Sequence, residues 1–134
     1  MKRRQGHDDG RQAAPFLDRR ATARASQAMR CLPFRRAFYE RLAAQAMGSE
    51  AFCRLPDAAD LCWGRLGADQ VETHVIWLIR LGVLRREVDG QGLTERVRLT
   101  PMGRELLAGW SGEIPRPSLM ERIHHRLRRS RPRL

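Results

Sequence analysis

The spacing between apolar residues changes twice within residues 67–107. In the first part of this stretch the apolar residues recur every three or four positions, at Val71, Val75, Leu78 and Leu81. This spacing predicts a helix over residues 69–81 with one buried stripe. Gly82 follows directly and predicts the end of that helix.

Two short strand patterns come next, over residues 83–88 and 93–99. Residues 89–92 join them, and the Asp89-Gly90 pair in this linker tolerates the positive φ of a tight hairpin turn. One face of the second strand is expected to carry Leu93, Val97 and Leu99, and the other Thr94, Arg96 and Arg98. The pattern therefore predicts a hairpin with one face in the core and the other in water.

A further helix is predicted immediately after the hairpin. Thr100 is a suitable N-cap, and Pro101 suits the first helical position, where its missing N–H costs nothing. The order helix, hairpin, helix is that of the second half of a winged helix-turn-helix.

Two segments carry a resemblance to bacterial winged-helix regulators of the MarR and PadR kind. LIRLGVLRRE at residues 78–87 resembles the end of their recognition helix and the first wing strand. RLTPMGRELL at residues 98–107 resembles the second wing strand and the helix behind it. The resemblance implies a mainly α fold with a two-stranded β-wing, a winged helix-turn-helix.

The segments before this unit predict two more core elements. A helix is expected over residues 33–47, with a buried stripe of Phe34, Phe38 and Leu42 and an end at Gly48. Residues 56–63 predict a short helix with Leu61 inward, in the place of the helix that braces a recognition helix.

Four regions follow from this organisation. Residues 1–24 are expected to be a basic mobile arm, although helical character begins near Ala21, and residues 25–110 form the winged helix-turn-helix domain. Residues 111–117 form a linker. Residues 118–134 form a basic amphipathic helix and tail, with a capping box of Ser118 and Glu121 and an apolar stripe of Leu119, Ile123 and Leu127.

The net charge of +11 is concentrated in the two ends of the chain. Residues 1–24 hold seven basic and three acidic groups, and residues 116–134 hold seven basic and one acidic group. Residues 25–115 are close to neutral. Such ends are either solvated tails or segments that grip phosphate groups. The C-terminal helix in particular could pack on the body, pair with a second subunit or lie on nucleic acid.

Catalytic, metal-binding and membrane-spanning signals are weak. No HExxH, GxSxG or Gly-rich phosphate loop occurs, so we do not expect an enzyme or a cofactor. Cys31, Cys53 and Cys62 form no CxxC pair and are expected to be buried apolar residues, while Cys53, Cys62 and His74 lack the regular spacing of a metal site. Because no apolar run is long enough to span a bilayer and no signal peptide is evident, we expect a cytoplasmic protein without membrane contact.

The resemblance to winged-helix regulators implies a set of DNA contacts. Gln70 and Thr73 would read bases in the major groove. The wing would hold the backbone through Arg85, Arg86, Arg96 and Arg98. Non-specific phosphate contacts would come from the C-terminal arginines Arg122, Arg126, Arg128 and Arg129. The alternative for the wing is a solvated face in which arginines pair with glutamates.

Two features depart from a usual DNA-reading helix. Asp69 and Glu72 place negative charge near the expected phosphates, although acids at a helix start also complement the helix dipole. The run over residues 75–79 is apolar, and Ile76, Trp77 and Ile79 exceed a single stripe. They are expected either to be covered by a terminal helix or to form an interface with another subunit.

The sequence therefore favours a small DNA-binding protein, a winged-helix transcriptional regulator that acts as a homodimer, with basic tails adding non-specific affinity. The alternative is a non-catalytic winged-helix adaptor that binds protein while its Arg-rich tails hold RNA or an acidic partner. The whole chain is also similar to a small cyanobacterial protein family with no assigned activity, which supports the fold more than the role.

Overall fold

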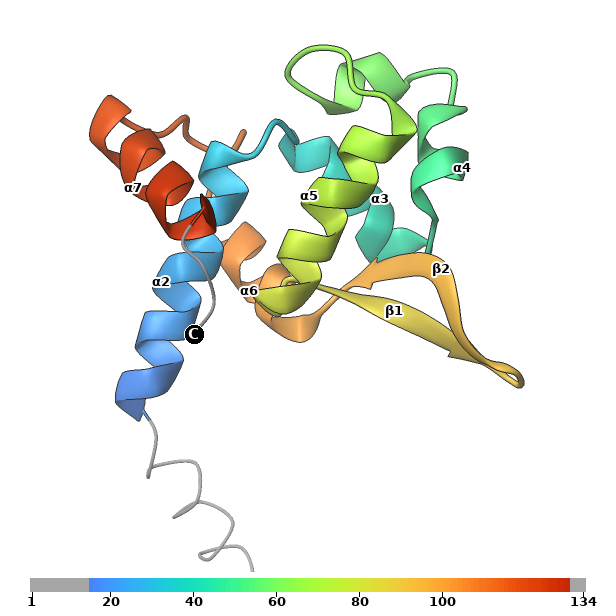
Figure 1. Cartoon of the computed structure of the whole chain (residues 1–134), viewed down its shortest axis with the longest axis horizontal. Helices are drawn as coiled ribbons and strands as arrows, with labels where there is room; N and C mark the ends of the chain where they lie inside the picture. Colours follow the sequence, from blue (N-terminus) through green and yellow to red (C-terminus); the bar gives the residue numbers. More distant parts are fainter. Residues whose placement is uncertain (1–14, 131–134) are drawn as a thin grey trace, which may run out of the picture.

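The computed structural model describes residues 15–130 and is mainly helical, with one two-stranded antiparallel sheet (Figure 1). The elements in chain order are α2 (Pro15–Cys31), α3 (Arg36–Ala44), α4 (Ser49–Cys53), the 3₁₀ helix η1 (Ala58–Leu61), α5 (Ala68–Arg80), β1 (Leu84–Asp89), β2 (Gly92–Leu99), α6 (Pro101–Ala108) and α7 (Leu119–Ser130). This confirms the mainly α class with a two-stranded sheet.

The N-terminal region differs from the predicted mobile arm. Helix α2 already begins at Pro15, so residues 15–24 are helical, and residues 1–14 of the predicted arm lie outside the described residues. Ala25, Ala28 and Met29 are buried in the second half of this helix, whereas Asp18, Arg19 and Arg20 in its first half are exposed. A stretch without buried apolar positions has no hydrophobic period, which explains why the pattern placed the helix start too late.

The predicted stripe of Phe34, Phe38 and Leu42 is buried and forms the centre of the core. The rings of Phe34 and Phe38 stack with their centroids 3.8 Å apart, and Phe52 meets Phe38 edge-on at 5.0 Å. Phe34 lies in the turn before α3, and the helix ends at Ala44 rather than at Gly48 because the chain becomes extended at Gln45.

Helix α5 has the predicted position, and its stripe is buried except at Leu81, which is half-buried just after the helix ends. Val71, Val75 and Leu78 are all at most 2% exposed, which anchors one side of the helix in the core. Gly82 has φ +85°, the left-handed conformation that lets the chain leave the helix and enter β1.

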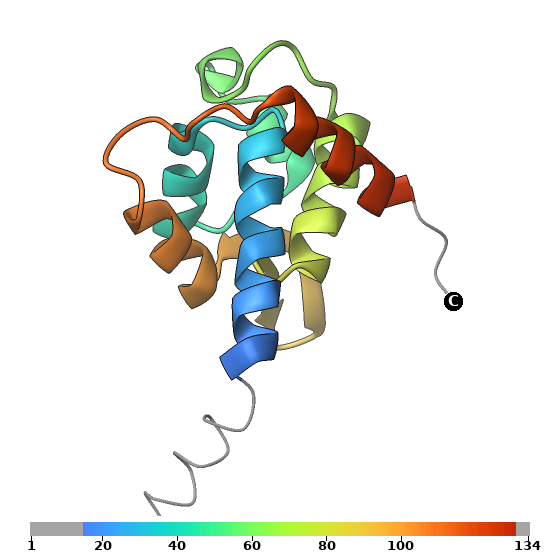
Figure 2. The ribbon, with the colours of Figure 1, turned by 90° about the vertical axis from the view of Figure 1, so that its left-hand side faces the viewer.

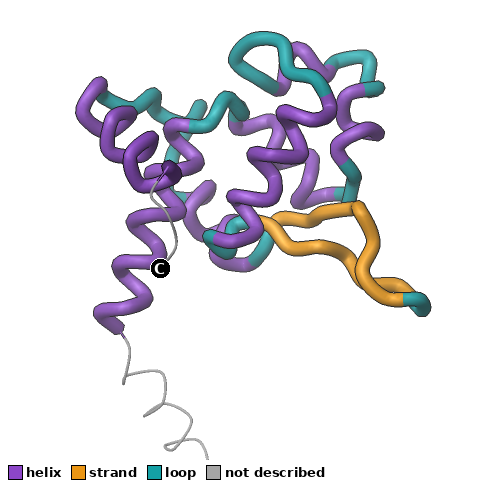
Figure 3. Tube along the Cα trace, in the orientation of Figure 1, coloured by secondary structure: helices purple, strands orange, loops and turns teal. Residues whose placement is uncertain are grey.

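The hairpin pairs from Leu84 with Leu99 to Asp89 with Gly92 (Figure 3). Val97 and Leu99 are buried as predicted, but Leu93 is 75% exposed. The prediction for Leu93 was wrong because the register shifts between Arg86 and Val88 and the hairpin projects beyond the core. Only the base of the hairpin is therefore part of the core.

The segment between α3 and α4 adds a short pairing to the hairpin. Met47 and Val97 exchange two backbone hydrogen bonds, of 3.1 and 3.0 Å, so the chain lies against β2 just before α4 begins. Helix α4 then packs on α5. The element that braces α5 is therefore α4 and not residues 56–63.

Residues 56–63 instead fasten the loop between α4 and α5 to the turn before α3. Leu61 is buried as predicted, in η1, and its carbonyl accepts a 2.9 Å hydrogen bond from the N–H of Arg35. A bridge between Phe34 and Cys62 strengthens this connection. These contacts hold the long connection between α4 and α5 against the start of α3.

Both predicted helix caps near the C-terminus are confirmed. The Thr100 hydroxyl accepts a 3.1 Å hydrogen bond from the N–H of Gly103 at the start of α6. Ser118 and Glu121 form the reciprocal capping box at the start of α7. The segment before α7 is fixed to the body by buried Ile114, and α7 lies against α2 (Figure 2).

Candidate nucleic-acid interface

Helix α5 leaves one face open to solvent. Its exposed residues at helical spacing are Asp69, Thr73, Ile76 and Arg80, which we call the open stripe. Ile76 is 41% exposed, a large fraction for an isoleucine in a small domain. The open stripe lies on the helix from which the hairpin emerges (Figure 1).

The three residues predicted as an interface do not form one surface. Ile76 belongs to the open stripe, whereas Ile79 is half-buried against the core. Trp77 is half-buried under α7, with the His125 ring 6.3 Å away and the guanidinium of Arg129 5.7 Å from the indole centroid. A terminal helix therefore covers Trp77, as one of the two alternatives expected, while Ile76 stays open.

The two predicted base readers are exposed at the start of α5. The side-chain oxygen of Gln70 accepts a 2.9 Å hydrogen bond from the N–H of Gly67, so this residue also caps the helix. The hydroxyl of Thr73 donates to the carbonyl of Asp69 within the same helix. Arg80 lies on the same open stripe and was not singled out from the sequence.

Three of the four predicted wing arginines are engaged in ion pairs. Arg98 and Arg96 lie 2.9 and 3.8 Å from the carboxylate of Glu87. Arg86 donates to Glu72 at 2.5 Å and to the carbonyl of Glu95 at 2.8 Å. These contacts correspond to the alternative in which the wing arginines pair with glutamates.

Arg85 is the fourth wing arginine, and it is exposed at the start of β1. Among residues 15–130 it makes no ion pair. Its guanidinium is therefore free to reach a phosphate group outside the chain.

Glu72 acts as a clamp between three elements. Its carboxylate accepts hydrogen bonds from the hydroxyl of Ser49 on α4, at 2.7 Å, and from Arg86 on β1. Burial opposes ionisation of Glu72, but these two hydrogen bonds outweigh burial and hold its pKa below the ordinary value. This role explains the acidic residue near the start of α5 without any contact to a ligand.

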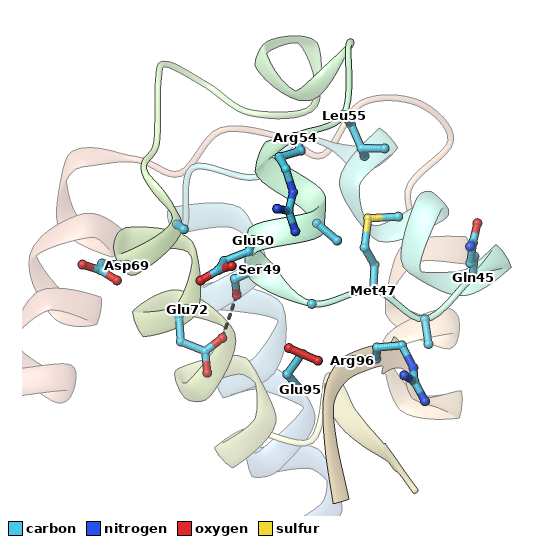
Figure 4. A pocket seen from close by; sticks show the side chains of 14 residues that line it. Gln45, Met47, Ser49, Glu50, Arg54, Leu55, Asp69, Glu72, Glu95 and Arg96 are labelled. Carbon is cyan, nitrogen blue, oxygen red and sulfur yellow. Dashed lines mark hydrogen bonds between the residues drawn. The ribbon is translucent and has the colours of Figure 1, made fainter. Parts of the chain in front are cut away.

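One flank of α5 is acidic. A groove of about 550 Å³ between α4, α5 and β2 is lined by four carboxylates and two guanidinium groups, from Glu50, Asp69, Glu72, Glu95, Arg54 and Arg96 (Figure 4). We call it the acidic groove. Part of its charge is neutralised because Arg86 pairs with Glu72, but carboxylates remain in excess. This flank is unfavourable for a phosphate backbone.

The flank towards α7 is basic. A pocket of about 470 Å³ lies between the end of α2, α5 and α7. Its charged and titratable lining consists of Arg116, Arg122, Arg126, Arg129, His74 and His125, together with the thiol of Cys31. We call it the arginine pocket. No carboxylate lines it, so the two sides of α5 differ in sign.

The histidines of the arginine pocket are held neutral. Burial, followed by the nearby charges of Arg129 and His125, lowers the pKa of His74 to about 4. Burial and the charges of Arg129 and Arg128 also lower the pKa of His125. The sequence pattern did not reveal this pocket, although three of its residues, Arg122, Arg126 and Arg129, recur at helical spacing on α7.

Helix α7 packs on the body through its polar side. Glu121 forms an ion pair with Arg30 on α2, and Arg129 donates a 3.1 Å hydrogen bond to His74 on α5. The predicted apolar stripe faces outward instead, with Leu119, Ile123 and Leu127 being 73%, 45% and 64% exposed. Arg128 lies apart from the arginine pocket and bonds to Gln27 at 3.2 Å.

The cysteines are free thiols. The prediction that the cysteines are buried is confirmed for Cys62, where burial raises the pKa to about 11, but it was wrong for Cys31 and Cys53, which are half-buried. No three His, Cys, Asp or Glu side chains of residues 15–130 lie close enough together to hold a metal ion. Within the same range, no helix has both the length and the apolarity needed to cross a bilayer.

Comparison with known families gives one match, to the Npun_F0494-like family model over residues 16–129. The chain belongs to the Npun_F0494-like family. This agrees with the resemblance to a small family without an assigned activity, because the description of the Npun_F0494-like family names none. No curated protein and no solved structure matches the chain.

Proposed function

We propose that this member of the Npun_F0494-like family binds duplex DNA as a winged helix-turn-helix. The observation that carries the proposal is the open stripe of α5, which stays uncovered beside a projecting hairpin. The chain order supports it, because α3, the Met47–Val97 bridge, α4, α5 and the hairpin follow one another as the helices and strands of a winged helix do.

In this proposal α5 lies in the major groove and its open stripe faces the bases. Thr73 offers a hydroxyl, and Arg80 offers a guanidinium that binds guanine through two hydrogen bonds. Arg85 at the base of the hairpin is placed for a phosphate contact. Arg86, Arg96 and Arg98 hold the wing in shape through their glutamate partners rather than contacting DNA.

The opposite charges on the two flanks of α5 orient the duplex. The acidic groove repels a phosphate backbone, while α7 and the arginine pocket attract one. One strand of the duplex therefore runs along the α7 side, where Arg122, Arg126, Arg128 and Arg129 add non-specific affinity. A role as a cytoplasmic transcriptional regulator and a homodimer is part of the same proposal.

The test begins with selection of duplexes from a random pool by the full chain. Affinity for the enriched duplex and for a scrambled one is then measured by fluorescence anisotropy at fixed salt concentration. Because a guanidinium-to-guanine contact contributes about 1–3 kcal/mol, we expect Arg80→Ala to lower the preference for the enriched duplex about tenfold or more. Thr73→Ala should lower this preference less.

The matched control is Arg19→Ala, which removes the same charge from an exposed position on α2. It should weaken binding to both duplexes equally and leave the preference unchanged. No enrichment by the full chain, or an equal loss of preference in Arg19→Ala and Arg80→Ala, would contradict duplex reading by α5.

The exposed apolar stripe of α7 favours a second candidate function, that of a non-catalytic adaptor. Leu119, Ile123 and Leu127 lie beside arginines, a combination suited to an acidic protein partner, and the basic tails would hold RNA or the same partner. Absence of binding to any duplex, together with saturable binding of an acidic amphipathic peptide that is lost in Ile123→Glu, would favour the adaptor over the regulator.

A further inference from the structure

The arginine pocket concentrates positive charge without any acidic residue in its lining. Its guanidinium groups come from α7 and from Arg116 in the segment before that helix. The nearest acidic residue on α7, Glu121, already pairs with Arg30. Guanidinium groups gathered around one pocket repel one another, and no carboxylate lines it, so an anion in the pocket would be favoured.

The side chains around the pocket are held by aromatic neighbours. Arg116 lies over the ring of Trp63, with the guanidinium carbon 5.2 Å from the ring centroid, and Arg129 lies 5.7 Å from the centroid of Trp77. Burial lowers the pKa of Arg129. These contacts fix two of the donors before any ligand arrives, which reduces the entropy lost on binding.

The two histidines add neutral donors. An arginine can only donate, so Nδ1 of His74 accepts the hydrogen bond from Arg129, and the proton of neutral His74 lies on Nε2. His125 is 8% exposed, and its Nε2 atom is buried without a hydrogen-bond partner among the described residues. A buried nitrogen with no partner is rare and often marks a missing ligand.

We propose that the arginine pocket binds one phosphate group, held by Arg116, Arg122 and Arg129 with His74 and His125 as additional partners. Several guanidinium groups match the three oxygens of a phosphate, each through paired hydrogen bonds, better than they match a carboxylate. A volume of about 470 Å³ exceeds that of one phosphate, so the rest of the ligand also fits there.

This inference does not rest on duplex reading by α5. The phosphate belongs either to a free phosphorylated compound or to a nucleic-acid backbone, and both share the chemistry of the site. In both cases the bound phosphate would contact α7 and α5 together, since Arg129 lies on α7 and His74 on α5.

The experiment uses the full chain and inorganic phosphate as the probe. Calorimetric titration at constant ionic strength, with chloride as the compensating anion, gives the stoichiometry and the affinity. Histidine-ring NMR signals are followed in the same titration. We expect saturable binding of one phosphate per chain. The ring signals of His74 and His125 should shift, whereas those of His124, which is exposed on α7 next to His125, should not. Because an anion stabilises the protonated ring, the pKa of His74 should rise.

Arg122→Gln is the main variant, because this side chain is exposed and forms no ion pair among the described residues. Loss of one charged hydrogen-bond donor should weaken phosphate binding about tenfold. Arg19→Gln is the matched control, since it removes the same charge from an exposed position on α2, away from the pocket. Thermal unfolding of both variants verifies that the fold is unchanged.

Two results would overturn the proposal: no saturable phosphate binding, or an equal loss of affinity in Arg122→Gln and Arg19→Gln. Competition then distinguishes the sources. If an added duplex displaces phosphate and Arg122→Gln weakens the duplex as well, the phosphate is that of nucleic acid. If no duplex displaces it, the pocket serves a free phosphorylated compound. Phosphate binding would persist even if α5 did not read DNA.

Discussion

Gly103 on α6 is the position where a single added methyl group has the clearest structural consequence. A Cβ atom at residue 103 would lie 2.7 Å from the carbonyl oxygen of Val83 and 2.6 Å from Cδ1 of Leu99. Optimal contacts of carbon are about 3.5–4.0 Å, so the backbone at Val83 or the start of α6 must retreat by about 0.8 Å. The side chain of Leu99 can rotate away, but the backbone of Val83 cannot.

The retreat would also disturb the cap of α6. The N–H of Thr100 donates to the carbonyl of Val83 at 2.9 Å, while the hydroxyl of Thr100 lies 2.5 Å from the carbonyl oxygen of Gly82 and 3.0 Å from that of Val83. Overpacking of this kind costs about 1–3 kcal/mol, and weakening the hydrogen bond from the N–H of Thr100 adds about 1 kcal/mol. Alanine regains about 1 kcal/mol through its helix propensity. We therefore expect Gly103→Ala to lower the free energy of unfolding by about 2 kcal/mol.

The assay is urea unfolding followed by far-UV circular dichroism, with Gly112→Ala as the control. No atom lies within 4 Å of the Cβ position at residue 112, so the control should change the free energy of unfolding by less than about 0.5 kcal/mol. If Gly103→Ala proves as stable as this control, the base of the hairpin does not press on α6, and the inferred position of the wing is wrong.

Three further predictions concern the clamp and the buried titratable groups. Glu72→Gln should lower the free energy of unfolding by about 0.5–1 kcal/mol, because the ion pair with Arg86 is partly solvent-screened, whereas Glu50→Gln in the same acidic groove should have no effect in urea unfolding. His74 has a folded-state pKa near 4, below its unfolded value, so the unfolded chain takes up a proton first as the pH falls below about 6.5. Stability should therefore decrease from about pH 7 to about pH 5, and urea titrations should show a smaller decrease for His74→Gln. Cys62, whose pKa is about 11, should be the last thiol to be alkylated in a mass-spectrometric time course; reaction as fast as that of Cys31 would show that it is accessible.

Local patterns were sufficient to predict α5, the hairpin and the caps of α6 and α7. Each depends on residues close together in sequence, such as the stripe of Val71, Val75 and Leu78 or the contact of Thr100 with Gly103. Residues 49–56 were expected to be a connection that could include a short turn of helix, and the bounds of α4 were not predicted because its five residues, Ser49–Cys53, are too short for a helical period to be recognised.

Whether a candidate DNA-contacting side chain is free or ion-paired depends on residues that are distant from it in sequence. Arg86 is neutralised by Glu72, which lies fourteen positions earlier, and this pairing follows only once α5 and β1 are placed in space. Similarly, the sequence left open whether α7 packs on the body; in the structure Glu121 pairs with Arg30 on the packed side, and the apolar stripe faces solvent. Periodicity identifies an amphipathic helix without showing which face meets the body.

The open stripe of α5 is the central element of the proposed function, and its contact with DNA can be mapped directly. Backbone amide NMR shifts of the full chain would be recorded with and without the enriched duplex. We predict that the largest changes fall on residues 69–80 and around Arg85. Changes confined to α2 and α7, with none on α5, would show that the chain holds nucleic acid by charge alone and would contradict reading by α5.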